Sequence, residues 1–150
     1  MKISIASDHA GFEQKQALVG YLASKGHDVI DRGPDCDDRV DYPDYAARVA
    51  HDVVDGMAER GVLVCGTGIG MAVAANKIDG IRAANVTSPL FAALAREHND
   101  ANVVAVGARQ HSEEEALALI DAFLETPFSG DERHQRRIDL MKDYERSVRA

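Results

Sequence analysis

A lone cysteine followed at once by a glycine-rich turn is the part of this chain best suited to chemistry. Residues 62–70 read VLVCGTGIG. The apolar residues before Cys65 are typical of a buried β-strand. Gly66, Gly68 and Gly70 carry no Cβ, so a ligand can come close to the backbone there. The pattern predicts a strand that delivers a thiol to a tight turn.

The same turn offers groups that suit an anion. Thr67 adds a hydroxyl, and residues 71–77 are predicted to form a helix. The first N–H groups of a helix have no partner within it and favour negative charge. A thiol, a hydroxyl and backbone N–H groups within a few residues indicate a reaction on a small anionic molecule.

Known nucleotide motifs fit the turn poorly. A dinucleotide-binding fingerprint requires G-x-G-x-x-G after the first strand, whereas the glycines here alternate, Met71 follows them and the strand is the third. A Walker A loop requires Gly-Lys-Ser/Thr, which is absent. A strand-to-helix turn that simply needs glycines stays an open alternative.

Each reactive side chain also has an ordinary structural explanation. A cysteine such as Cys65 is more often a small buried hydrophobe, although a nearby helix N-terminus would stabilise its thiolate. Asp8 could merely cap the helix after the first strand, while His9 beside it could donate to an anion or move a proton. His98 lies at a predicted helix end, where histidine also favours the helix dipole, or it could act as a general acid. Cys36 lies in a polar loop, and we assign it no role.

Basic residues gather near the end of this acidic chain. Arg133, His134, Arg136 and Arg137 form its dense basic cluster. Arg133 and Arg137 are four residues apart, so both can project from one helix face and bind a phosphate. The histidines and cysteines lack the spacing of a metal site, and we expect no metal.

The elements that must position these groups alternate along the chain. Strands are predicted at residues 2–7, 27–31, 62–65, 81–86 and 102–106. Helices are predicted at residues 11–24, 45–58, 71–77, 89–97, 113–124 and 131–149, and residues 32–44 are predicted to form a loop. This order predicts an α/β fold: one domain, 1–150, with a doubly wound, Rossmann-like three-layer arrangement, a five-stranded parallel sheet and a C-terminal helical extension.

Ligands of such sheets bind beyond the carboxyl ends of the strands. Asp8 and His9 follow the first predicted strand, the Cys65 turn follows the third, and Arg109 follows the fifth. His98, Asn99 and Asp100 follow the helix after the fourth. We therefore expect these groups to meet at one edge of the sheet.

Composition excludes several classes of function. The 150 residues carry a formal net charge of −8, which argues against a general nucleic-acid or anionic-membrane binder. No apolar run approaches the ~20 residues of a membrane span, and the first residues do not resemble a signal peptide. Two cysteines make no disulfide framework, so we expect a cytoplasmic location.

Taken together, the motifs resemble those of the ribose-5-phosphate isomerase B family, which includes galactose- and allose-6-phosphate isomerases. The resemblance covers essentially the whole chain. Its motifs are SDHAGF at 7–12, DYPDYA at 41–46, CGTGIGMAVAANK at 65–77, GIRAA at 80–84, EHNDANV at 97–103, GAR at 107–109 and RHQRR at 133–137. Small departures fall at residues 85–87 and 131–132.

The resemblance implies an aldose–ketose isomerase that uses no metal or other cofactor. Ribose 5-phosphate to ribulose 5-phosphate is the expected reaction. A six- or four-carbon sugar phosphate is the alternative substrate, and a non-catalytic flavodoxin-like binding module is the alternative from another class. The family forms homodimers, sometimes homotetramers, with sites shared between subunits. The C-terminal helix is therefore expected to bind phosphate or to make dimer contacts.

The resemblance also implies residue roles. Cys65 would move a proton between C1 and C2 through an enediolate, Thr67 would handle the proton on the substrate oxygens, and His98 would open the furanose ring. Some branches use a glutamate a few residues after the cysteine position, but Ala74 and Ala75 offer no carboxylate here. The substrate-binding residues would be Asp8, His9, Tyr42, Gly66, Gly68, Ile69, Gly70, Asn99, Arg109, Arg133 and Arg137.

Overall fold

Five parallel strands form the central sheet of this protein. The structure is a computed structural model that describes residues 1–149. The strands are β1 (Lys2–Ser7), β2 (Asp28–Asp31), β3 (Arg60–Cys65), β4 (Ala83–Asn85) and β5 (Val103–Gly107), in the order β2-β1-β3-β5-β4. All four strand pairs are parallel, as predicted.

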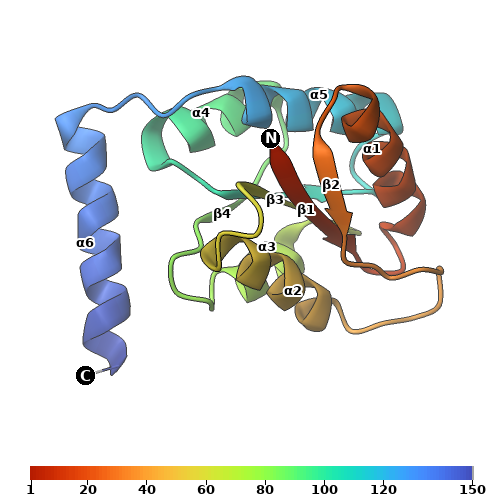
Figure 1. Ribbon diagram of the computed structural model, residues 1–150, viewed down its shortest axis with the longest axis horizontal. Coiled ribbons are helices and arrows are strands. Elements are labelled where there is room, and N and C mark those ends of the chain that lie inside the picture. The colour runs from red at the N-terminus through yellow and green to blue at the C-terminus, as the bar shows by residue number, and fades with distance from the viewer. Residues whose placement is uncertain (150) are drawn as a thin grey trace.

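Helices cover both faces of this sheet (Figure 1). The helices are α1 (Phe12–Ser24), α2 (Tyr42–Val54), α3 (Ile69–Ala75), α4 (Pro89–Asn99), α5 (Glu113–Glu125) and α6 (Glu132–Arg149). Helices α1, α4 and α5 pack on one face, and α2 and α3 pack on the other. The predicted three-layer, doubly wound arrangement is confirmed.

Side-chain alternation along the strands divides the core in two. Ile3 and Ile5 point into the cluster beneath α1, α4 and α5, whereas Ala6 points toward α2 and α3. On β3, Leu63 and Cys65 also lie on the α2–α3 side. This period of two is the geometry of an extended strand, and it sets the face on which the Cys65 thiol lies.

The strand order separates this sheet from the flavodoxin arrangement. In flavodoxin-like folds the order is 2-1-3-4-5, whereas here β5 lies between β3 and β4. The Cys65 turn therefore lies beside the end of β5, where Cys65 pairs with Gly107.

Several predicted boundaries are wrong, and α3 spans Ile69–Ala75 rather than residues 71–77. Helix α2 begins at Tyr42, three residues earlier than predicted, with Asp41 at the N-cap position and Pro43 in the first turn. Proline is favoured there because the first N–H groups have no partner within the helix. Helix α2 also ends at Val54 rather than at residue 58.

Strand β4 is three residues long, not six. The amide of Asn76 borders this short strand: its Oδ1 accepts the N–H of Ala83 at 2.8 Å, and its Nδ2 donates to the carbonyl of Ala83 at 2.9 Å. Arg82 likewise donates its N–H to the Asn102 side chain at 2.8 Å rather than to a strand. Side chains thus replace strand partners at this edge of the sheet.

Helix α6 stands at one side of the molecule, apart from the three layers (Figure 1). A segment without helix or strand joins it to α5. Ile138 is buried, and the Glu145 carboxylate accepts the N–H of Gly80 at 3.3 Å. None of the helices described in residues 1–149 combines the length and the apolar character that a membrane span needs.

Candidate active site

The Cys65 thiol is buried and faces a backbone N–H. Its side chain is 5% exposed, and Sγ accepts the N–H of Gly68 at 3.1 Å. The turn was predicted to direct backbone N–H groups at a substrate anion, and the structure directs at least this one at the cysteine.

Two glycines make this geometry possible. Gly68 has φ +81°, and a Cβ there would lie 2.7 Å from Oδ1 of Asn85 and 3.0 Å from the backbone of Val106. A Cβ on Gly107 would lie 2.8 Å from the backbone of Thr67. Contacts this short require atoms to move, so both positions admit only glycine without rearrangement.

Thr67 presents its hydroxyl at the surface of the turn. Its Oγ1 accepts the N–H of Ile69 at 3.2 Å, and the residue is exposed. An accepting hydroxyl keeps its own proton available to donate. The side chain is thus held in place yet free to hydrogen-bond a substrate oxygen.

Other predicted residues lie around the same turn. A Cβ on Gly70 would lie 2.8 Å from the Tyr42 ring, and one on Gly66 would lie 3.2 Å from Nη1 of Arg109. The Asp8 N–H donates to the carbonyl of Val64 at 3.1 Å, next to Cys65 in the chain. The carboxyl-edge cluster consists of Asp8, His9, Tyr42, Arg109 and residues 65–70.

The Asp8 side chain does not cap the next helix, because it bonds the N-cap residue Gly11 rather than an N–H of the first helical turn. Its Oδ1 accepts the N–H of Gly11 at 3.0 Å, and the side chain is largely buried. His9 is held from its other side, because the N–H of Val40 donates to Nδ1 at 3.4 Å. That bond leaves Nε2 as the ring nitrogen able to carry a hydrogen toward a ligand.

The remaining predicted residues lie elsewhere. His98 and Asn99 end α4, and Arg133 and Arg137 lie exposed in the first turns of α6. The carbonyl of Asn102 accepts the N–H of Gly61, near the start of β3, which places the end of α4 at the amino edge of the sheet. We call His98, Asn99, Arg133, His134 and Arg137 the amino-edge cluster.

The two clusters lie at opposite edges of the sheet. β5 connects the edges and has five residues, a length of about 15 Å for parallel strands. A furanose ring with its phosphate does not span that gap together with both sets of side chains. Within one chain, the structure does not bring Cys65 and His98 to one substrate.

His134 packs directly against His98. Their ring centroids are 4.4 Å apart, and Nδ1 of His134 lies 2.7 Å from the Ser129 hydroxyl. Burial lowers the pKa of His134, and the nearby His98 and Arg133 lower it further. The sequence predicted His134 only as part of a basic cluster, whereas its ring is buried against that of His98.

One cavity lies away from both clusters. It measures about 640 Å³ and lies beside α2, where Arg32 forms a bidentate ion pair with Asp52. A second hollow of about 420 Å³ borders Tyr42 and Gly70 and is lined mainly by apolar side chains. Among residues 1–149, no group of three or more His, Cys, Asp or Glu side chains could hold a metal ion.

The fold and the carboxyl-edge cluster are those of an α/β enzyme that handles small metabolites. A family model described as ribose/galactose isomerase matches residues 3–141. The chain belongs to the ribose/galactose isomerase family.

Curated relatives cover the full length of the chain. Ribose-5-phosphate isomerase B of Mycobacterium tuberculosis H37Rv is 44% identical over 153 residues, covering 100% of this chain and 93% of that protein. The Escherichia coli K12 protein of the same name is 44% identical over 140 residues, covering 93% of each chain. The chain is thus an isomerase, and the flavodoxin-like binding module is excluded.

Solved structures agree closely. Ribose-5-phosphate isomerase B of Clostridium thermocellum superposes with a TM-score of 0.97 at 42% identity, covering 99% of each chain. The Mycoplasma genitalium enzyme, solved with bound ribulose-5-phosphate, gives a TM-score of 0.91 at 44% identity, covering 97% of this chain and 96% of that one.

Proposed function

We propose that this protein interconverts ribose 5-phosphate and ribulose 5-phosphate without a metal. The observation that carries the proposal is the buried Cys65 thiol, held by a backbone N–H at the carboxyl edge where α/β enzymes bind ligands. The similarity to a relative that binds ribulose-5-phosphate supports the choice of sugar.

The proposed chemistry assigns each proton to a residue. His98 opens the furanose ring by moving a proton between the ring oxygen and the anomeric hydroxyl. The Cys65 thiolate then removes the proton on C2 and returns it to C1, while the O2 proton passes to O1 by way of Thr67. The enediolate between these steps carries negative charge, and those backbone N–H groups of residues 66–70 that do not donate to Cys65 or Thr67 stabilise it.

Sugar and phosphate contacts follow from the same assignment. Asp8, His9, Tyr42 and Asn99 line the sugar, and Arg109, Arg133 and Arg137 bind the phosphate. Guanidinium groups suit a phosphate because they donate paired hydrogen bonds to its oxygens.

The experiment compares kcat/KM for ribose 5-phosphate with kcat/KM for allose 6-phosphate and galactose 6-phosphate. The proposal expects ribose 5-phosphate to be preferred. A clear preference for a six-carbon substrate would contradict the assigned sugar, and no turnover of any of the three would contradict the function.

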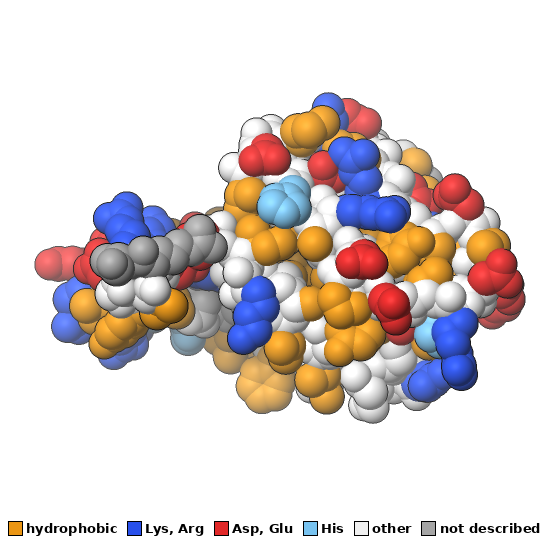
Figure 2. All heavy atoms as spheres, turned by 90° about the horizontal axis from the view of Figure 1, so that it is seen from below, with side chains coloured by type: hydrophobic (Ala, Val, Ile, Leu, Met, Phe, Trp, Pro, Cys, Tyr) orange, Lys and Arg blue, Asp and Glu red, His pale blue; other side chains and the backbone are white. Residues whose placement is uncertain are grey.

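We further propose that the protein is a homodimer in which each site combines both clusters. One chain holds the carboxyl-edge cluster about a strand length away from its own amino-edge cluster, so a second copy must supply the other half. Exposed apolar side chains flank both halves: Ile69 and Val73 on α3, and Leu140 and Tyr144 on α6. Figure 2 shows apolar side chains gathered on the α2–α3 face, with α6 standing beside it.

Mixing two inactive variants tests this arrangement. Cys65→Ala and His98→Ala damage different clusters, so a mixed dimer holds one intact site. Random exchange of subunits should restore about a quarter of native activity in a two-fold dimer. If each site lay within one chain, mixing would restore none. The matched control mixes Cys65→Ala with Thr67→Ala, which lie in one cluster and should not complement.

We also propose that 1–150 acts as a single domain whose C-terminal helix contributes to phosphate binding. A cytoplasmic location is proposed because Cys36 and Cys65 are both free thiols, the state that a reducing compartment maintains.

A further inference from the structure

The turn that ends α4 has an unusual backbone. Asp100, directly after His98 and Asn99, has φ +44° and ψ +44°. It is the one non-glycine residue with positive φ among residues 1–149. This left-handed conformation costs a side-chain-bearing residue about 1 kcal/mol, although aspartate tolerates it better than most. Something in the structure must hold the turn in place.

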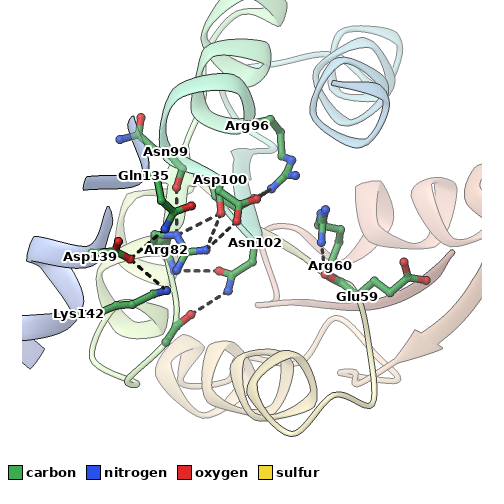
Figure 3. Close-up of polar contacts among 12 residues, drawn as sticks. Glu59, Arg60, Arg82, Arg96, Asn99, Asp100, Asn102, Gln135, Asp139 and Lys142 are labelled. Atoms are coloured by element: carbon green, nitrogen blue, oxygen red, sulfur yellow. Dashed lines mark hydrogen bonds and ion pairs between the residues drawn. The ribbon is translucent and has the colours of Figure 1, made fainter. Parts of the chain in front are cut away.

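Two arginines bind the Asp100 carboxylate from different sides (Figure 3). Oδ1 accepts from Nη1 of Arg96 at 2.8 Å, and Oδ2 accepts from Nη2 of Arg82 at 3.3 Å. Arg96 is only 3% exposed and also donates to the carbonyl of Thr126 at 3.3 Å. The carboxylate is thus fixed to α4 itself and to the segment before β4.

The backbone of the turn is fixed by the same groups. Nε of Arg82 donates to the carbonyls of Asn99 at 3.0 Å and Asp100 at 3.1 Å, and Nη2 donates to the latter at 2.9 Å. The last carbonyls of a helix have no partner within it, and here guanidinium groups satisfy them. Asn99 therefore has its carbonyl tied to Arg82, while its amide points away from this network (Figure 3).

The Asp100 carboxylate offsets positive charge that gathers around the turn. Burial lowers the pKa of Arg60, and the nearby Arg96 and Arg82 lower it further. Two of these three guanidinium groups bind Asp100. Without that carboxylate, Arg82 and Arg96 would repel each other and lose their shared anchor.

We propose that Asp100 is a positioning residue for His98 and Asn99: its carboxylate locks Arg82 and Arg96 and so fixes the left-handed turn that aims both side chains at the substrate. This inference rests on the proposed function, in which His98 opens the sugar ring. Asp100 itself touches no reacting atom.

The test uses a pair of rates that separate ring opening from proton transfer. The first is kcat with ribose 5-phosphate, which is mainly a closed furanose and must be opened. The second is the rate at which ribulose 5-phosphate takes up deuterium at C1 from D₂O. Ribulose 5-phosphate is open-chain, because the hydroxyl that would close a five-membered ring carries the phosphate. Its exchange therefore needs Cys65 but no ring opening.

Asp100→Gly removes the carboxylate but accepts the left-handed backbone, so it removes the anchor without adding strain. We expect kcat with ribose 5-phosphate to fall about tenfold to a hundredfold, the cost of a misplaced acid–base group. Deuterium exchange should stay near the native rate, with native far-UV circular dichroism. Asp28→Asn, which removes an exposed carboxylate 3.7 Å from Lys2, is the control and should change neither rate.

Two results would overturn the inference: native kcat in folded Asp100→Gly, or equal falls in kcat and exchange. Asp100→Asn, which also tolerates the left-handed backbone, covers the case in which the glycine variant fails to fold. It should show a smaller but selective fall in kcat, and native kinetics would again contradict the inference. A native chain that neither isomerises nor exchanges would instead contradict the proposed function.

Discussion

The two clusters hold their reactive side chains in contrasting ways. At the carboxyl edge, close packing of the backbone holds the reactive thiol. Gly68 and Gly107 leave room for the turn, and a backbone N–H donates to the Cys65 sulfur. At the amino edge, charged side chains hold the reactive groups, since Arg82 and Arg96 fix the turn through Asp100. Adding atoms should therefore disrupt the carboxyl-edge cluster, and removing charge should disrupt the amino-edge cluster.

The largest effect is expected at the carboxyl edge, from Cys65→Ala. Removing the proposed base should lower kcat about a thousandfold, within the usual range for acid–base groups. The measurements are isomerisation and deuterium exchange at C1, which should fall together. Cys36→Ala is the matched control, because that thiol is exposed and donates a hydrogen bond to Asp38 at 3.4 Å. Near-normal turnover in Cys65→Ala would rule out the assigned mechanism.

Gly68→Ala should damage stability as well as rate. The left-handed backbone and the contacts with Asn85 and Val106 together should cost about 2–4 kcal/mol of unfolding free energy. Gly26→Ala is a close control, since Gly26 has φ +87° but no atom within 4 Å of its Cβ position. That variant should lose only about 1 kcal/mol. Urea unfolding of both variants gives the comparison, and equal losses would show that close approach is not what Gly68 provides.

Arg137→Ala tests the role of charge in the amino-edge cluster. Losing a charge-assisted bond to phosphate should raise KM about tenfold or more. The neighbouring Arg136, expected on another helix face, provides the control through Arg136→Ala. Steady-state kinetics with ribose 5-phosphate would decide the matter. If both variants raised KM equally, the effect would reflect general charge rather than a phosphate contact.

The smallest expected effect concerns His134 and pH. Its pKa lies below the ordinary 6.5, because burial and the neighbouring His98, Arg133 and Arg137 disfavour the charged ring, although Asp131 opposes them. The unfolded chain therefore binds a proton first as pH falls. The stability that this histidine contributes is present above about pH 6.5 and declines below it until the folded pKa is reached.

His134→Phe keeps an aromatic ring against His98 but removes the titration. Between pH 7 and pH 5, the midpoint temperature of thermal unfolding should fall less in the variant than in the native chain. His51→Phe, at an exposed histidine on α2, is the control. An unchanged acid sensitivity in His134→Phe would show that another group is responsible.

Periodicity along the chain was enough to predict the sheet. Alternating strand and helix patterns gave five parallel strands, and the capping box of Ser112 and Glu115 marked the start of α5 correctly. Tyr42 was misplaced in a loop because Pro43 and the surrounding aspartates resemble loop residues, although proline also suits a first helical turn.

The division of the site could have been partly foreseen. A helix that returns between parallel strands runs antiparallel to them, so the end of α4 must lie at the amino edge, away from Cys65. The Asp100 network could not have been foreseen, because it joins Arg82 to residues 17 and 18 positions away through side-chain contacts. The spacing of apolar residues along the chain does not predict such contacts.

The amide of Asn76 occupies the outer edge of β4 as a substitute strand, using both the N–H and the carbonyl of Ala83. An open edge is where one sheet recruits another, and such recruitment leads toward fibrils. With this edge occupied, lateral growth of the sheet is blocked on the β4 side. On this side of the sheet, contact with another protein is thereby left to helical faces rather than to strand pairing.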